Sequence, residues 1–348
     1  MKYFMLVESK LLVIFYVLFT TIFVNISAQV DPIEKGLKAI NEDVLRAQLG
    51  FLASDWTEGR ETGSKGEYLA GDYIASMLQL YGVKPFGDMS TTQGKRSYFQ
   101  DFILLKTIIG EEQTFQLKTI EEKSTQAISL NEQVPVRNIL GIIEGKNTEE
   151  YIVLGAHYDH MGIKNGHIWN GADDNASGTV GIMTIAKAIT ETGVKPEKSI
   201  IIALWTAEEV GLLGSKYYLD NLPYPLSRIK MNLNFDMISR YIADDKPRNV
   251  TMTYTDKYHP MFRNITVSNL KKYGIDLVVD YQPSANPPGG SDHRSFTAKD
   301  IPVMRFKPGH REEYHTPWDK ISTVNWDIME KIIKISFANI WNLANTEW

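Results

Sequence analysis

Cysteine is absent from the 348-residue sequence. Disulfide bonds, thiolate metal ligands and a lipid anchor on an N-terminal cysteine are therefore excluded. A chain of this length can still fold outside the cell, because it can bury enough apolar surface to do without disulfide cross-links.

An excess of positive charge is also absent. The sequence has 37 Lys and Arg against 42 Asp and Glu, which gives a formal net charge of -5. The two signs are mixed along the chain, without a long tail of one sign. Because nucleic-acid-binding domains usually carry a basic face, a nucleic-acid partner is not expected.

A long uncharged run occurs only at residues 11–28. It ends in small residues before the polar Gln29, as at the cleavage site of a signal peptide. An uncleaved membrane anchor is the alternative, because about 20 apolar residues can span a bilayer. The short apolar core favours a signal peptide over residues 1–28. We therefore predict export, to the periplasm or beyond the cell, without stable membrane insertion after cleavage.

The remaining residues, 29–348, are interpreted as a single domain. Residues 31–83 have helical patterns, residues 97–143 are rich in strand-forming residues, and strands alternate with helices from residue 151 onward. Such alternation predicts an α/β fold with a mainly parallel, mixed central sheet that is flanked by helices on both faces. The uninterrupted apolar run at 199–207 is typical of a strand that is covered on both faces.

Polar side chains follow several of the predicted strands. His157 follows the strand at 151–156, Glu208 and Glu209 follow the strand at 199–207, and Asp236 follows the strand at 228–235. Two further residues occupy similar positions: Asp174, before the helix at 176–193, and His315, in the loop after the strand at 301–306. Because the ends of parallel strands meet at one edge of a sheet, we expect these side chains to converge.

Imidazoles and carboxylates without sulfur are ligands for divalent metals such as zinc. Five convergent ligands suggest two metal ions that share one carboxylate, about 3.5–4 Å apart. Three carboxylates, from Asp174, Glu209 and Asp236, against four positive charges would leave one charge for a bridging hydroxide. Each residue also has a structural alternative, since a lone His at a strand end is usually a satisfied polar residue and acids often begin helices.

His157 has a further feature that favours the metal interpretation. Asp159 lies two residues later and points the same way along an extended chain. Its carboxylate can accept the other ring N–H of His157 and fix the tautomer.

Six sequence motifs resemble those of the M28 family of co-catalytic zinc exopeptidases, of the aminopeptidase Y type. In chain order they are GAHYDH, GADDNASG, AEEVGLLGS, NLNFDM, GGSDHRSF and YHTPWD. The resemblance extends from about Asn41 to the C-terminus. It implies a zinc-exopeptidase-like three-layer sandwich, of the phosphorylase/hydrolase-like kind. Residues 97–143 are too few for a separate protease-associated domain.

The resemblance also implies roles for individual residues. One ion would be held by His157, Asp174 and Asp236, and the second by Asp174, Glu209 and His315. Glu208 matches the general base of the family, and Tyr314 matches a tyrosine that stabilises the oxyanion. A cis peptide bond is expected between Asp173 and Asp174.

The turn-rich segment 283–296 allows two interpretations. Ser291, Asp292 and His293 could hydrogen-bond the backbone of a rigid turn, or they could line a substrate pocket, as the similar segment does in the family. Neither interpretation makes them metal ligands.

The expected function is that of an exported, metal-dependent exopeptidase with two divalent ions, zinc being favoured. Its substrates would be peptides, and the family favours an aminopeptidase that hydrolyses N-terminal residues. A single-zinc enzyme of the glutaminyl cyclase type is the first alternative, and a non-catalytic binding domain of the same fold is the second. The preferred residue, carboxypeptidase activity and the oligomeric state are left open by the sequence.

Overall fold

A computed structural model describes residues 31–90, 94–109, 112–118, 133–241, 243 and 245–348. The predicted signal peptide, residues 1–28, lies outside this range. Within it, ten strands form one mixed sheet, and a short ribbon consists of β6 (Ile163–Lys164) and β7 (His167–Ile168). Among these residues, none of the helices combines the length and the apolar character that a membrane crossing requires.

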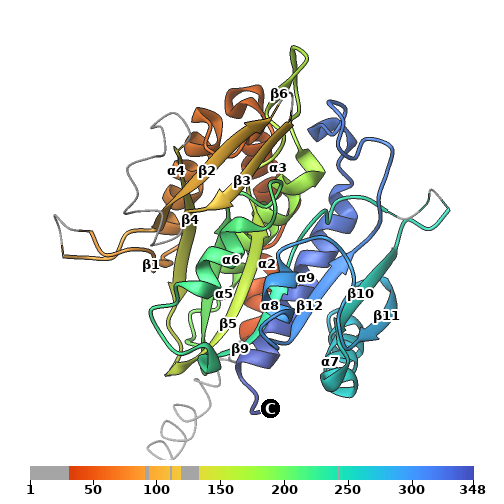
Figure 1. Ribbon diagram of the computed structural model, residues 1–348. Coiled ribbons are helices and arrows are strands. Elements are labelled where there is room, and N and C mark those ends of the chain that lie inside the picture. Colours follow the sequence, from red (N-terminus) through yellow and green to blue (C-terminus); the bar gives the residue numbers. More distant parts are fainter. Residues whose placement is uncertain (1–30, 91–93, 110–111, 119–132, 242, 244) are drawn as a thin grey trace, which may run out of the picture.

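The centre of the sheet is parallel, as the sequence predicts (Figure 1). Its four parallel strands, in spatial order, are β12 (Val303–Lys307), β9 (Ile229–Asn234), β5 (Asn147–His157) and β8 (Lys198–Trp205). Strands on both sides extend it: β4 (Gln133–Ile143), β2 (Phe99–Ile109), β3 (Glu112–Leu117) and β1 (Lys84–Pro85) beyond β8, and β10 (Asn249–Thr255) and β11 (Val278–Ser284) beyond β12. β4 is antiparallel to β8 and β10 is antiparallel to β12.

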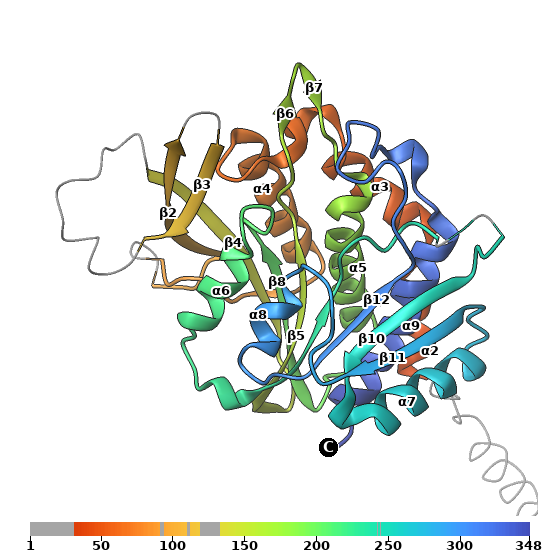
Figure 2. The ribbon, with the colours of Figure 1, turned by 45° about the vertical axis from the view of Figure 1, so that its right-hand side comes forward.

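Helices cover both faces of this sheet (Figure 2). One layer contains α2 (Pro32–Lys38), α3 (Glu42–Leu52), α4 (Lys65–Leu80), α5 (Gly178–Glu191) and α9 (Trp326–Ala344). The other contains α6 (Leu213–Asp220) and α8 (His293–Thr297), while α7 (His259–Lys272) packs on α9 and β10. Short helical turns complete the connections: Asp55–Arg60, Ala172–Ser177, Leu226–Arg228, Asp256–Tyr258 and Ile321–Thr323.

β8 is continuously apolar from Ile200 to Trp205, and its surroundings explain why. Ile200, Ile202 and Leu204 pack into the larger helical layer, and the alternating residues Ile201, Ala203 and Trp205 pack beneath α6 and α8. Because side chains alternate between the two faces of a strand, burial on both faces requires an apolar residue at every position.

Helix boundaries follow local signals in the sequence. α9 begins after Asn325, whose side-chain oxygen accepts a hydrogen bond from the backbone N–H of Ile328 at 3.2 Å. After α5 the chain turns at Gly193, whose φ of 71° suits a residue without a side chain. The predicted helices at 325–345 and 176–193 are thus confirmed to within two residues at each end. β10 and β11 were not predicted.

Candidate functional site

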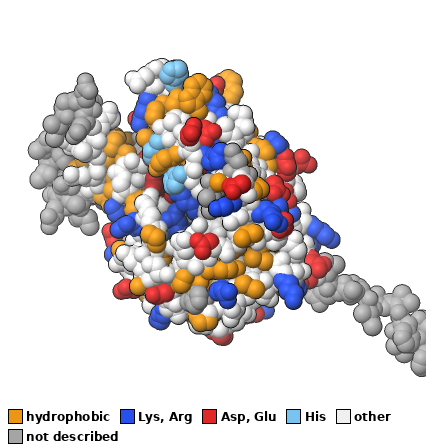
Figure 3. Space-filling model, turned by 90° about the vertical axis from the view of Figure 1, so that its right-hand side faces the viewer, with side chains coloured by type: hydrophobic (Ala, Val, Ile, Leu, Met, Phe, Trp, Pro, Cys, Tyr) orange, Lys and Arg blue, Asp and Glu red, His pale blue; other side chains and the backbone are white. Residues whose placement is uncertain are grey.

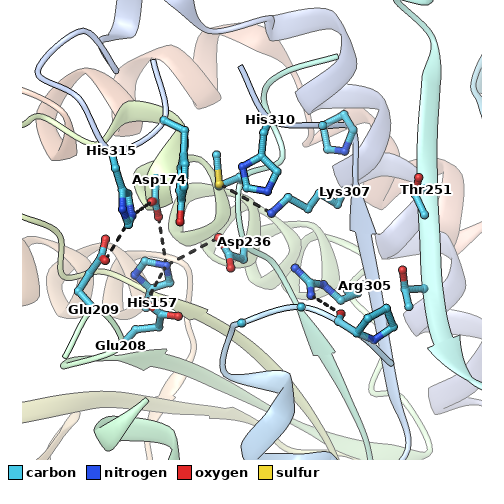
Figure 4. Close-up of a pocket in the computed structure, with 18 of the residues that line it drawn as sticks. His157, Asp174, Glu208, Glu209, Asp236, Thr251, Arg305, Lys307, His310 and His315 are labelled. Atoms are coloured by element: carbon cyan, nitrogen blue, oxygen red, sulfur yellow. Dashed lines mark hydrogen bonds and ion pairs between the residues drawn. The ribbon is translucent and has the colours of Figure 1, made fainter. Parts of the chain in front are cut away.

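A cavity of about 730 Å³ lies at the edge of the sheet where the central parallel strands end (Figure 4). Every residue that the sequence predicts to be a metal ligand or a catalytic group lines this cavity: His157, Asp174, Glu208, Glu209, Asp236, Tyr314 and His315. The predicted convergence is therefore confirmed.

Asp174 lies between the two imidazoles. Its Oδ1 is 3.4 Å from Nε2 of His157, and its Oδ2 is 3.0 Å from Nε2 of His315. Each oxygen thus faces a different histidine. This is the arrangement that a carboxylate bridging two ions would need.

Two further carboxylates extend the cluster on opposite sides. Oε2 of Glu209 lies 3.5 Å from Nε2 of His315, and Oδ1 of Asp236 lies 3.8 Å from Nε2 of His157. Glu208 is next to Asp236, with its Oε2 3.9 Å from the same His157 nitrogen. The adjacent side chains of Glu208 and Glu209 therefore point to different parts of the cavity.

The charges of this cluster perturb one another strongly. Burial raises the pKa of Glu208 to about 10, and Asp292, Asp236 and Glu209 add to the rise although His157 opposes it. Burial acts against the charged form of Asp174, but the imidazoles of His157 and His315 hold its pKa well below the ordinary value.

Divalent cations fit this donor set. The structure contains two groups of three residues in which one ligand atom from each residue lies within 4.8 Å of the other two. These groups are His157–Asp174–Glu209 and His157–Glu208–Asp236. Crowded buried carboxylates are costly unless a cation compensates them. Imidazole and carboxylate donors without sulfur suit borderline ions such as zinc. Neither group includes His315, so the division of ligands between two ions stays a prediction.

Asp159 holds the site in a different way from the one predicted. Nδ1 of His157 lies 3.2 Å from the backbone oxygen of Asp159 and 3.6 Å from its carboxylate. A carbonyl can only accept, so this contact favours the proton on Nδ1 and directs the Nε2 lone pair of the neutral ring toward the cavity. The Asp159 carboxylate instead accepts the backbone N–H groups of Glu208, at 3.1 Å, and Glu209, at 3.3 Å.

The turn that carries Asp174 is fixed by Asp319, which sequence reasoning missed. The Asp319 carboxylate accepts the backbone N–H groups of Asp173 and Asp174, each at 2.9 Å, and forms an ion pair with Arg240 at 3.0 Å. The expectation of a cis peptide bond between Asp173 and Asp174 was wrong by one position, since the cis bond joins Asp174 to Asn175.

His160 was also missed. Its Nδ1 lies 2.7 Å from Oε1 of Glu209, and its ring is buried. Its position three residues after His157 carried no signal that separates it from an ordinary buried histidine.

The predicted segment 283–296 does reach the cavity, but the assignment of Ser291, Asp292 and His293 to its wall was wrong. All three are buried and none lines the cavity; the turn before them, Pro288 to Gly290, does. Ser291 instead accepts a hydrogen bond from the side-chain amide of Asn234 at 2.9 Å.

Two cations in the cavity wall were not predicted. Arg305 and Lys307 are on β12, opposite Thr253 and Thr251 of β10, and all four residues line the cavity. The alternation Met304, Arg305, Phe306, Lys307 was a signal for this, because it places both cations on one face of the strand.

Known proteins resemble the chain in sequence and in fold. Leucine aminopeptidase 2 of Trichophyton equinum is 33% identical over 184 residues, which are 51% of this chain and 34% of that enzyme. Aminopeptidase YwaD of Bacillus subtilis is 27% identical over 246 residues, 68% of this chain and 49% of that protein. The matched region therefore spans about a third to a half of the length of these curated relatives.

Solved structures share the fold at lower sequence identity. The LapA aminopeptidase of Legionella pneumophila superimposes with a TM-score of 0.64 at 22% identity, covering 91% of this chain and 74% of that one. BSAP, a zinc aminopeptidase of Bacillus subtilis, gives a TM-score of 0.64 at 18% identity, covering 88% and 96%. A sequence model described as peptidase family M28 matches residues 138–340, which are more than half of the chain, and the protein therefore belongs to this family.

Proposed function

We propose that this protein is a metal-dependent aminopeptidase that removes N-terminal residues from peptides. The observation that carries the proposal is the convergence of two imidazoles and four carboxylates on one cavity at the ends of the parallel strands. The leucine aminopeptidases among the relatives support hydrolysis at the N-terminus rather than at the C-terminus.

Five side chains would hold two divalent ions, zinc being favoured. His157 and Asp236 lie on one side of Asp174, and Glu209 and His315 lie on the other. Such ions would supply Lewis-acid activation of the scissile carbonyl and of water.

Glu208 is the residue that we assign to proton transfer. It lines the cavity beside the ligand cluster, and its backbone is fixed by the carboxylate of Asp159. Divalent ions bound beside Glu208 would offset the burial and the neighbouring carboxylates that raise its pKa, so its carboxylate would be ionised. It could then take a proton from the attacking water and pass it to the leaving amine.

Tyr314 would stabilise the tetrahedral oxyanion. Its ring stacks on His315 with a centroid distance of 3.9 Å, and the residue lines the cavity. Burial and the surrounding carboxylates raise its pKa to about 12, so at neutral pH the hydroxyl keeps its proton and can donate a hydrogen bond.

Glu208→Gln tests the proposal directly. We expect the turnover number on aminoacyl p-nitroanilides to fall by a factor on the order of 10²–10⁴, because proton transfer is lost. Metal content, measured by mass spectrometry, should stay at two ions per chain. Glu312→Gln, at an exposed glutamate of the loop that carries Tyr314, is the matched control and should keep full activity. Retained activity of Glu208→Gln, or loss of both ions, would contradict the assignment.

The same preparation separates the two alternatives. One ion per chain, together with conversion of N-terminal Gln to pyroglutamate, would support a glutaminyl cyclase type of enzyme. Failure to bind any divalent ion would support a binding domain.

We also propose that the protein is exported. The support is the apolar run at residues 11–28, which ends in small residues before Gln29. N-terminal sequencing of the protein recovered outside the cytoplasm should give a chain that begins near residue 29. A mature chain that retains residues 1–28 in the membrane fraction would indicate an anchor.

A further inference from the structure

The wall of the cavity formed by β10 and β12 has a distinct chemistry. The antiparallel register pairs Thr251 with Lys307 and Thr253 with Arg305. These four side chains line the cavity, whereas the alternating residues Met304 and Phe306 are fully buried in the core. The carboxylates that line the cavity all come from other elements: the turn before α5 and the segments that follow β8 and β9.

Arg305 is held rigidly in this wall. Its side chain points into the cavity (Figure 4), yet the residue is only 4% exposed. Nη1 donates to the backbone oxygen of Pro288 at 3.1 Å and lies 3.3 Å from Nε2 of His293. Burial and the nearby guanidinium lower the pKa of His293 to about 3, so that ring is neutral.

Neither cation forms a direct ion pair with a described carboxylate, although Asp236 interacts with both electrostatically at longer range and Glu208 does so with Arg305. Among the residues that the structure describes, no Asp or Glu oxygen lies within 4 Å of the Arg305 guanidinium or the Lys307 ammonium. Lys307 Nζ lies 3.9 Å from Sδ of Met237. A buried guanidinium is seldom left without an anionic partner, because the desolvation of its charge is costly.

On the face shown in Figure 3, Lys and Arg side chains gather around a hollow, beside His side chains.

A carboxylate is the anion that suits the wall formed by β10 and β12. The planar guanidinium can donate two parallel N–H groups to it, the ammonium can approach from the neighbouring position, and the threonine hydroxyls can donate as well.

We propose that Arg305 and Lys307 bind a carboxylate group of the substrate and thereby set the specificity of the enzyme. The inference rests on the proposed peptidase function. Two parts of a peptide could supply the carboxylate: an acidic side chain, Asp or Glu, at the N-terminal residue, or the free C-terminus of a dipeptide. Both present the same group to the same two cations.

Paired substrates distinguish the two sources. The first pair is Glu-p-nitroanilide and Gln-p-nitroanilide, and the second is Leu-Gly and Leu-Gly-amide. For the pair that carries the recognised carboxylate, kcat/KM should exceed that of its neutral partner by about tenfold or more. Lys307→Gln should reduce this ratio about tenfold, mainly through KM. Arg305→Lys keeps the charge but loses the bidentate contact with the carboxylate, so it should reduce the kcat/KM ratio less than Arg305→Gln does.

Lys271→Gln is the matched control, because Lys271 is an exposed residue of α7 and its exchange changes the net charge equally. It should leave both ratios unchanged. Lys307→Gln keeps the test decisive if substitution of the buried Arg305 prevents folding. The proposal is overturned if both substrate ratios are near one, or if Lys307→Gln and Lys271→Gln behave alike.

A binding measurement separates this proposal from the proposed function. Calorimetry on the metal-loaded Glu208→Gln variant, which should bind these dipeptides without hydrolysing them, should show tighter binding of L-glutamate than of L-glutamine, or of Leu-Gly than of Leu-Gly-amide. Adding Lys307→Gln should abolish the difference. Absence of turnover on every substrate would refute the peptidase function, while the calorimetric difference would still decide the carboxylate site. Equal binding within both pairs would refute the site even in an active enzyme.

Discussion

Glu67 is a buried acid whose ionisation should make the protein less stable as the pH rises. It is 1% exposed, on α4 beneath the end of β8. One carboxyl oxygen accepts the hydroxyl of Thr206, and the other accepts the backbone N–H of Gly63 at 2.6 Å. Burial raises its pKa from 4.5 to about 8, and the charge of Asp159 adds to this although both hydrogen bonds and Arg137 oppose it.

The sign and the size of the change in stability follow from the difference between the pKa of Glu67 in the native state and its ordinary value in the unfolded chain. The native state keeps the proton to higher pH than the unfolded chain does, so the contribution of Glu67 to stability is greatest below pH 4.5 and declines until about pH 8. Each pH unit within that window costs up to about 1.4 kcal/mol. Between pH 5 and pH 7 the loss amounts to about 2.5 kcal/mol, because the unfolded chain ionises progressively over the first unit.

Glu67→Gln should remove this loss, because the amide has nearly the same shape. Its oxygen can accept the Gly63 N–H, and its nitrogen can donate to Thr206. In urea unfolding of the metal-free protein, followed by tryptophan fluorescence, the free energy of unfolding of the variant relative to the wild type should rise by about 2.5 kcal/mol from pH 5 to pH 7. The exposed Glu191→Gln is the control. A relative stability of Glu67→Gln that is the same at both pH values would show that Glu67 titrates alike in both states, and the reasoning would fail.

Three further predictions concern the supports of the site. Arg60 is fully buried and donates hydrogen bonds to the backbone oxygens of Leu52, Tyr158, Asn170 and Gly171. Arg60→Met should therefore lower the free energy of unfolding in urea titrations by about 3 kcal/mol or more, and a loss below about 1 kcal/mol would argue against this role. Asp319→Asn should weaken zinc binding about 10–100-fold in chelator competition, because the turn bearing Asp174 loses an anionic acceptor; unchanged affinity would refute the role. Removal of metal by a chelator should lower the melting temperature, since the clustered carboxylates then repel one another, and two equivalents of zinc should restore it.

The central fold could be predicted because its signals are local. Strands covered on both faces have continuous apolar runs, and the helices between them end at recognisable caps. β11 gave no such signal, because its residues are half-buried or exposed at the edge of the sheet. β10 did carry a signal, since polar and apolar residues alternate over Asn249–Thr255, but its partners in the sheet become clear only when β12 is in place.

The contrast between local and long-range signals also explains which residues of the site could be predicted. The residues that face the cavity from strand ends could be nominated, because each directly follows a predictable strand. Asp319 could not, since the turn that it supports lies 146 residues earlier in the chain. Ser291, Asp292 and His293 were misplaced because sequence alone does not tell which residues of a tight turn face the cavity.

The two-sided construction of β10 and β12 has a consequence for how such an enzyme can diverge. One face of this ribbon completes the core, and the other carries Thr251, Thr253, Arg305 and Lys307 toward the cavity. Exchanges at Thr251 and Lys307 leave the residues of the core and of the ligand cluster untouched, whereas Arg305 is buried and also donates to the backbone oxygen of Pro288. Under the carboxylate-binding proposal, selectivity and chemistry would be carried by separate strands, so that selection or design could change one without rebuilding the other.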